Sequence, residues 1–422
     1  MNDVRLEMLG KRPTANHGVC KTHSSESPFM TSARWRGLAV LLAALLQSAT
    51  VLYLGTSVSG GDAFTYIALS DDWLSARDLL SPGAFEGNFW PAGYPGFIAL
   101  FAWAGESQII VIRMAHILLA AGVALMAGLL ADTTSRKVGT VTTVLVAFSP
   151  TSLWAVWAIG YELVLGFLLL TALVLALRSA TSGNRASSAM AGLLFGLALL
   201  VQFRALLAVV LVVVLVSVNS RRAGAYLSLG ALVPVLSWSI RSFVALGNPA
   251  PWSANGPYNL WNGNNPVATG HNVFPLPELP AGYTSYTSAA LDWIIQNPTD
   301  FGFLTAKKFL FLFEPTRISW VSDPYPGEVL VTGLESVLAA LLVSGTVLFL
   351  ILRFVSRERE LQPLDVPFWF AVTYLLPNVI FIVEARFAIP VHAILIAVSV
   401  SAFYVLLARL SSREQLLSRS AS

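Results

Sequence analysis

From Trp35 onward the sequence contains a series of apolar runs of roughly 20 residues, the length that a helix needs to cross ~30 Å of hydrocarbon. Inside a bilayer the backbone N–H and C=O groups meet no water, so each run must satisfy them within its own helix. The runs fall at roughly 37–58, 108–131, 138–157, 160–178, 189–203, 205–219, 224–245, 329–352, 366–383 and 387–408. The sequence therefore predicts an all-α polytopic membrane protein with about ten transmembrane helices.

The composition excludes a soluble globular chain. Of the 422 residues, 55% are hydrophobic and 12% are charged, whereas soluble domains carry about 25% charged residues. The mean hydropathy of +0.68 points the same way. The net charge of +3 comes from dispersed basic residues, so we expect no nucleic-acid partner. The single cysteine, Cys20, offers no internal disulfide, metal cluster or redox pair.

The distribution of Lys and Arg predicts the orientation of the helices. The positive-inside rule assigns the connections that are rich in these residues to the cytoplasm. These residues are Arg136, Lys137, Arg178, Arg185, Arg221, Arg222, Arg353, Arg357, Arg359, Arg409 and Arg413. We therefore expect a protein of the cell (inner) membrane with both termini in the cytoplasm. Two long loops, at roughly 59–107 and 246–328, are expected on the exoplasmic side. The first apolar run lacks a signal cleavage site and is expected to be retained.

The sequence divides into a membrane domain and two cytoplasmic tails. Their expected bounds are 1–33 for the first tail, 34–410 for the membrane domain and 411–422 for the second tail. The first tail lacks apolar periodicity and is expected to be disordered, with Met30 as an alternative start. In the exoplasmic loops, DDWLSARDLL (71–80) and TDFGFLTAKKFLFLF (299–313) combine apolar and charged residues, which predicts helices in the membrane interface.

The first candidate for chemistry is Asp62 in SGGDAFTYIALS, directly after the first apolar run. Two glycines permit a tight turn there, after which the chain restarts as a helix with Asp62 near its N-terminus. One interpretation is a helix cap, which is a common role of Asp. The other is a carboxylate at the exoplasmic surface that takes a proton from a hydroxyl or holds a divalent cation.

Two other loop segments could bind a sugar. In NFWPAGYPGFIALFAW (88–103), aromatic residues alternate with prolines, which is typical of interfacial anchors but also suits stacking of Tyr94 on a sugar ring. In YNLWNGNNPVATG (258–270), the amides of Asn264 and Asn265 can donate and accept hydrogen bonds, as sugar hydroxyls require. A purely structural turn explains the same asparagines.

Glu162 and several basic residues depart from the expected charge pattern. Glu162 lies in AVWAIGYELVLGFLLL, where an ionisable group is costly and tends to be functional unless it reaches water at the adjacent turn. Cations on the exoplasmic side are Arg113, Arg204, Arg241, Lys307, Lys308, Arg317 and Arg386. Salt bridges, such as Arg386 with Glu384, or snorkelling explain part of this set. A phosphate at the membrane surface explains the rest, because guanidinium groups bind phosphate oxygens bidentately.

Five segments, taken in order, resemble a known family: GGDAFTYIALS, WPAGYPGFIAL, SPTSLWAVWAIGYELVLGFLL, NLWNGNNPVATG and EARFAIPVHAILIA. Together they are similar to integral-membrane glycosyltransferases of the C-type superfamily, in the branch related to protein O-mannosyltransferases and to the aminoarabinose transferase of lipid A. The resemblance covers nearly the whole chain after residue 35. It implies an inverting transferase that uses a polyprenyl-phosphate-linked sugar on the exoplasmic side.

The resemblance also implies roles for individual residues. Asp62 matches the catalytic acid of the first loop, and Arg386 matches the arginine that meets the donor phosphate. The residues expected to contact substrate are Tyr66, Tyr94, Glu162, Arg204, Asn264, Asn265, Lys307, Lys308 and Arg386. Many relatives have two adjacent acids in the first loop, whereas Gly61 precedes Asp62 here. A divalent cation held by Asp62 and Glu162 therefore stays open, and no cofactor is assigned.

The expected partners are a polyprenyl-phosphate sugar, membrane lipid, and an acceptor hydroxyl carried by a lipid, a glycan or a protein. Asp62 would deprotonate that hydroxyl, which attacks the anomeric carbon from the face opposite the lipid phosphate. The alternative is a multi-pass transporter or flippase of lipid-linked sugars without transferase activity. A transporter is expected to place charges near the bilayer midplane on broken helices, whereas here they gather at one face and in the loops.

Overall fold

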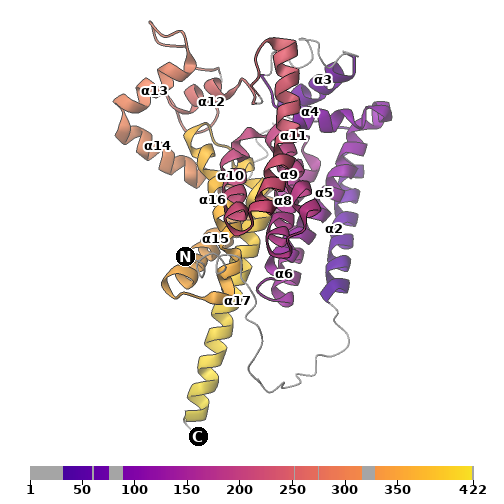
Figure 1. Ribbon diagram of the computed structural model, residues 1–422, viewed down its shortest axis with the longest axis vertical. Helices are drawn as coiled ribbons and strands as arrows, with labels where there is room; N and C mark the ends of the chain where they lie inside the picture. Colours follow the sequence, from indigo (N-terminus) through magenta and orange to yellow (C-terminus); the bar gives the residue numbers. More distant parts are fainter. Residues whose placement is uncertain are drawn as a thin grey trace.

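The computed structural model describes residues 32–58, 61–75, 89–250, 252–273, 275–315 and 328–420. Within these residues every regular element is a helix, and the long helices run mostly along the long axis of the molecule (Figure 1). The prediction of an all-α polytopic membrane protein is confirmed. Of the tail 1–33 that is predicted to be disordered, residues 1–31 lie outside the described residues, whereas 32–33 begin the first described helix. The alternative start at Met30 and Arg317 also lie outside the described residues.

Among the described residues, six helices are long and apolar enough to cross a membrane. They are α2 (Ser32–Leu54), α5 (Gln108–Ala131), α8 (Glu162–Ser182), α11 (Arg221–Leu246), α15 (Glu328–Leu350) and α17 (Ile389–Ser420). A pair bent by 46°, α6 (Arg136–Ala147) and α7 (Pro150–Trp157), makes a seventh if it forms one span. The bend lies at Ser149, which caps α7 by accepting a hydrogen bond from the backbone of Ser152.

The expected count of about ten crossings is not confirmed, because three of the predicted helices are short. They are α9 (Arg185–Val201), α10 (Leu206–Asn219) and α16 (Asp365–Ile380), with 17, 14 and 16 residues. At 1.5 Å per residue these helices are about 21 to 26 Å long, less than the ~30 Å of a hydrocarbon core. The turns at one end of all three helices line the pocket described below.

The bundle is packed around α8 and α17, which have the largest share of buried residues among the long helices, while α11 and α15 have the smallest. Small residues permit close approach of backbones between helices. A Cβ atom at Gly192 of α9 would lie 2.0 Å from the carbonyl oxygen of Leu227 in α11. One at Gly196 would lie 2.4 Å from the carbonyl oxygen of Ala231, so glycine is required at this contact.

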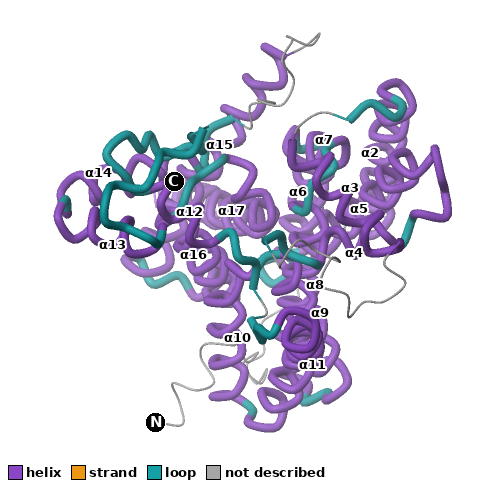
Figure 2. Tube along the Cα trace, turned by 90° about the horizontal axis from the view of Figure 1, so that it is seen from above, coloured by secondary structure: helices purple, strands orange, loops and turns teal. Residues whose placement is uncertain are grey.

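The helices of the two long loops lie towards one end of the bundle, opposite the end from which α17 projects (Figure 1). They are α3 (Gly61–Ser75), α4 (Gly93–Ala99), α12 (Gly256–Gly263), α13 (Tyr286–Gln296) and α14 (Pro298–Phe311). Figure 2 shows α13 and α14 on the opposite flank from α2 and α5. The helix predicted over 299–313 is confirmed by α14. Of the segment 71–80, α3 includes 71–75, and the rest lies outside the described residues.

Candidate functional site

The candidate site is built around Arg386, which lies in the short turn Ala385–Ala388 directly before α17 and is 8% exposed. One terminal nitrogen donates to Asp62 Oδ2 at 2.7 Å. The Nε atom donates to Glu384 Oε2 at 2.5 Å, and the other terminal nitrogen lies 3.5 Å from Glu162 Oε1. Three residues that are far apart in the sequence, Asp62, Glu162 and Arg386, are therefore brought together.

Both distant carboxylates sit at the start of a helix. Asp62 lies in the first turn of α3, and Glu162 is the first residue of α8. The unpaired N–H groups at these helix ends favour a negative charge. Gly160 allows the Glu162 side chain to fold back, since a Cβ atom there would lie 2.3 Å from Glu162 Oε2. The local sequence thus places each carboxylate at the start of a helix, and Arg386 bridges the two.

The carboxylates differ in accessibility. The Glu162 side chain is 2% exposed, while those of Asp62 and Glu384 are 26% and 23% exposed. Three carboxylates share one guanidinium, so the cluster carries an excess of negative charge and can accept a proton. Of the two carboxylates that the sequence predicts for the site, Asp62 and Glu162, Asp62 is the more exposed to solvent. For Glu384 the sequence indicates only a salt bridge with Arg386.

Tyr66 and Tyr94 form a buried aromatic support beside Asp62. Their rings meet edge to face with centroids 5.1 Å apart, and they are 3% and 1% exposed. The Tyr94 hydroxyl lies 3.4 Å from His116 Nε2. Burial raises the pKa of Tyr66 well above its ordinary value, and the nearby Asp62 carboxylate adds to this, so its hydroxyl stays protonated. The face of Tyr94 that was expected to stack on a sugar is covered by protein.

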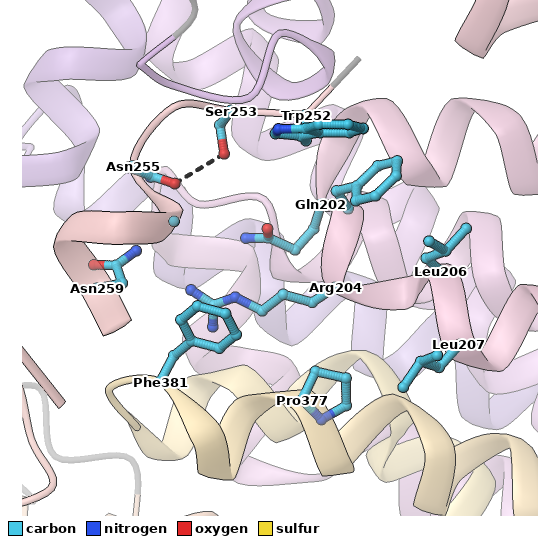
Figure 3. A pocket seen from close by; sticks show the side chains of 12 residues that line it. Gln202, Arg204, Leu206, Leu207, Trp252, Ser253, Asn255, Asn259, Pro377 and Phe381 are labelled. Carbon is cyan, nitrogen blue, oxygen red and sulfur yellow. Dashed lines mark hydrogen bonds between the residues drawn. The ribbon is translucent and has the colours of Figure 1, made fainter. Parts of the chain in front are cut away.

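A pocket of about 320 Å³ lies over the ends of the three short helices (Figure 3). Its lining comes from the turn between α9 and α10, the start of α10, the end of α16, and the loop before α12 with the first residues of α12. The lining residues are Gln202, Phe203, Arg204, Leu206, Leu207, Trp252, Ser253, Asn255, Gly256, Asn259, Pro377 and Phe381. Most are apolar or carry amides, and Arg204 supplies the positive charge.

Arg204 joins this pocket to the carboxylate cluster. One of its terminal nitrogens donates to Asn378 Oδ1 at 3.0 Å, and its guanidinium carbon lies 4.3 Å from the ring centroid of Phe387. Arg386 lies against the same ring, at 5.6 Å. In Figure 3 the side chains of Arg204 and Gln202 extend side by side across the pocket. The pocket therefore adjoins the carboxylate cluster across the ring of Phe387.

Tyr161 also lies between the pocket and the carboxylate cluster. It directly precedes Glu162 in the sequence, and the charges of Glu162, Arg204 and Arg386 all act on its hydroxyl, so it lies near both arginines. Burial raises the pKa of Tyr161 to about 12, with a further contribution from Glu162. Its hydroxyl therefore stays protonated and can act as a hydrogen-bond donor at neutral pH.

Asn264 and Lys308 are brought together away from the carboxylate cluster. Lys308 is fully buried and donates to Asn264 Oδ1 at 3.1 Å. The Asn264 amide donates to the backbone oxygens of Leu260 and Ile380 at 2.8 and 2.7 Å, which ties the second loop to the end of α16. Burial lowers the pKa of Lys308 to about 7. This pair fixes the loop that carries the pocket wall.

The two remaining predicted contact residues lie apart from the cluster. The Asn265 amide is buried and donates to the backbone oxygens of Trp261 and Asn262, which holds the turn of the same loop. Lys307 lies over the ring of Phe311, at 5.3 Å, on α14. Neither residue contacts Asp62, Glu162 or Arg386 in the part of the chain that the structure describes.

The residues do not fit a divalent cation as they stand. Among the described residues, no three His, Cys, Asp or Glu side chains gather in a way that could hold a metal ion. Asp62 and Glu162, the two candidate ligands, both face the guanidinium of Arg386. The guanidinium of Arg386 therefore supplies the positive charge between these two carboxylates.

Sequence reasoning missed most of the pocket. Trp252 and Phe381 are far apart in the sequence and lie outside the candidate motifs, whereas Asn259 belongs to the asparagine-rich segment 258–270. Asn378 and Phe387, which hold Arg204, are ordinary members of apolar segments. For the carboxylate cluster the sequence carries one further signal, because Glu384 lies two residues before Arg386.

Comparison with known proteins gives a likeness of fold. No protein-family model matches the sequence, and no curated protein matches it. The structure of the oligosaccharyltransferase AglB from Archaeoglobus fulgidus, in complex with an inhibitory peptide and a dolichol-phosphate, matches with a TM-score of 0.52 and 14% identity. The match covers 91% of this chain and 52% of AglB.

Two further structures of the Archaeoglobus fulgidus oligosaccharyltransferase are similar to the same degree. The apo form matches with a TM-score of 0.51 over 90% of this chain and 52% of that one, at 14% identity. The complex with Zn and sulfate matches with a TM-score of 0.51 over 89% and 50%, at 14% identity. This chain thus spans about half the length of these proteins. The likeness is one of fold, and both membership of the C-type superfamily and the branch within it stay predictions.

Proposed function

We propose that this protein is a membrane glycosyltransferase that moves a sugar from a polyprenyl-phosphate-linked donor to an acceptor hydroxyl, with inversion. The observation that carries the proposal is the junction of two features in one site. A carboxylate cluster with a reachable Asp62 adjoins an apolar pocket that contains Arg204. The likeness of fold to an oligosaccharyltransferase whose structure holds a dolichol-phosphate supports the same class of reaction.

The contacts favour a division of roles between the two arginines. Arg386 already contacts three carboxylates, so it is suited to hold Asp62 in place rather than to bind a further anion. Arg204 lines the pocket, and apart from its bond to Asn378 its N–H groups have no hydrogen-bond partner among the described residues. In the proposed mechanism Arg204 therefore binds the donor phosphate, a role that the sequence suggested first for Arg386.

The proposed reaction is a single displacement. Asp62 accepts the proton of the acceptor hydroxyl as its oxygen forms a bond to the anomeric carbon. The bond from that carbon to the phosphate oxygen breaks on the opposite face, and the lipid phosphate leaves with the bonding electron pair. Arg204 stabilises the negative charge that develops on the phosphate. Glu162 and Arg386 keep the carboxylate of Asp62 oriented towards the acceptor.

The pocket also has the walls that a lipid-linked donor requires. Leu206, Leu207 and Pro377 line it from α10 and α16, and Leu207 is 53% exposed. An isoprenoid chain can follow this apolar surface while its phosphate reaches Arg204. Trp252 and the amides of Asn255 and Asn259 face the same space and suit a sugar ring. In this proposal the site lies on the exoplasmic side of the cell membrane, with both termini in the cytoplasm.

The test uses purified full-length protein in proteoliposomes with a panel of radiolabelled polyprenyl-phosphate sugars. We expect one donor to be consumed, with release of polyprenyl phosphate and label on a lipid, glycan or peptide acceptor. The Asp62→Asn variant is the catalytic control and is expected to consume the donor at least about 100-fold more slowly. Movement of a lipid-linked sugar between leaflets without any transfer would contradict the proposal and support the transporter or flippase alternative.

A further inference from the structure

Arg113 makes an unusual set of contacts that the proposed reaction does not use. It lies near the start of α5, is 1% exposed, and donates from three nitrogens to backbone carbonyl oxygens. Its terminal nitrogens donate to Gly55 and Ser57, each at 2.6 Å, and its Nε donates to Trp157 at 3.0 Å. Its guanidinium carbon also lies 5.6 Å from the ring centroid of Trp157.

The three carbonyls belong to the two segments that lead into the carboxylate cluster. Gly55 ends α2 in a left-handed conformation, with φ of +61°, and Ser57 lies five residues before Asp62. Trp157 ends α7 and lies five residues before Glu162. A guanidinium has a fixed planar geometry, so it sets the distance between these two segments.

We propose that Arg113 is a positioning residue, which holds the segments that deliver Asp62 and Glu162 to Arg386. This inference rests on the proposed function, because positioning is defined by the transfer that Asp62 performs. A carbonyl turned towards Arg113 cannot rotate without leaving a buried cation unpaired, which is strongly disfavoured. The clamp therefore keeps both segments in one conformation before substrate binds.

Arg36 provides a matched control at the other end of α2. It is also a buried arginine, 8% exposed, and it donates to Asp132, Thr140 and the backbone oxygen of Arg136. Removing either arginine breaks several hydrogen bonds near one end of α2. Arg36 is at the end of α2 away from the carboxylate cluster, so its loss should affect stability without affecting the geometry of the site.

The experiment compares Arg113→Met, Arg113→Lys and Arg36→Met in the full chain. We expect Arg113→Met to lower kcat by on the order of 100-fold with little change in donor KM, the scale of a displacement of about 1 Å at a reacting group. Arg113→Lys should recover part of kcat, because an ammonium can satisfy some of the carbonyls but not all three in a fork. Arg36→Met should lower the Tm and leave kcat within about threefold of wild type.

Hydrogen–deuterium exchange gives a readout that does not depend on transfer. Loss of the clamp should speed backbone exchange in 52–58 and 155–161 in both Arg113 variants and leave these peptides unchanged in Arg36→Met. Unchanged exchange and kcat in Arg113→Lys would overturn the inference, as would equal losses of kcat in Arg36→Met and Arg113→Met. If wild-type protein transfers no sugar, the proposed function fails, while the exchange experiment still tests the clamp.

Discussion

Replacement of Asp62 by Asn separates a catalytic carboxylate from a structural one. The amide keeps the size of the side chain and caps a helix about as well as Asp. It cannot take a proton from the acceptor hydroxyl. Transfer should therefore fall by at least about 100-fold, on the scale of lost general-base catalysis.

The structure also sets the expected effect on stability. The change removes one charge-assisted hydrogen bond to Arg386, which is worth about 1.5–3 kcal/mol in a favourable case. Asp62 is 26% exposed, however, and Arg386 keeps its contacts with Glu162 and Glu384. Solvent screening and relief of repulsion between the carboxylates reduce the net cost to about 1 kcal/mol. For a chain of 422 residues the Tm should therefore fall by about 1 °C.

Asp365 offers a closely matched control. It is also the first acidic residue of a helix, its side chain is 16% exposed, and it accepts from Arg353 at 2.7 Å. Asp365→Asn should lower the Tm to a similar extent and leave the rate of transfer unchanged. The assay is donor consumption in proteoliposomes together with thermal unfolding of each variant. Near-normal transfer by Asp62→Asn would refute the catalytic assignment and leave Asp62 as a helix cap.

Three further predictions concern the two arginines of the site, the buried Lys308, and the orientation of the chain in the membrane. Arg204→Ala should weaken donor binding about tenfold to a hundredfold, because a charge-assisted hydrogen bond of about 1.5–3 kcal/mol is lost. Arg386→Ala should mainly lower kcat. A donor titration that finds the larger loss of affinity in Arg386→Ala would reverse these roles. Burial lowers the pKa of Lys308 to about 7, so between pH 7 and its unfolded value the unfolded chain binds more protons and stability should rise with pH. Thermal unfolding against pH should lose that rise in Lys308→Met, and an unchanged pH profile would contradict a neutral buried Lys308. Finally, Ser253→Cys in a Cys20→Ala background should react with an impermeant thiol reagent in intact cells, and reaction only after permeabilisation would reverse the predicted orientation.

The helices could be predicted from the sequence because membrane insertion selects directly for apolar length. Every predicted run coincides with a helix or a bent pair, including 366–383, where α16 lies. What the runs could not show is whether each helix crosses completely. The turn at 202–205 lies between the end of α9 and the start of α10, and it packs against α16, a contact that no local signal in the sequence reveals.

The candidate site was only partly predictable. Asp62 and Glu162 stand out because a carboxylate next to an apolar helix is costly, so few sequences place one there. Asn264 and Asn265 stand out for their hydrogen-bonding capacity, yet their amides bind backbone carbonyls of this chain. A sequence shows how many hydrogen bonds an amide can make but not with which partner. The same limit applies to Arg386, whose three carboxylates come from different parts of the fold.

The convergence of helix ends explains why this site can hold so much negative charge. Asp62 and Glu162 lie at the N-termini of α3 and α8, and Arg386 directly precedes the N-terminus of α17. Each of these ends carries partial positive charge, which lowers the cost of placing carboxylates there. When Asp62 takes a proton from the acceptor, the cluster loses one negative charge as the departing phosphate beside Arg204 gains one. The proposed transfer thus moves negative charge from the cluster to the pocket within one site, so its net charge changes little during the reaction.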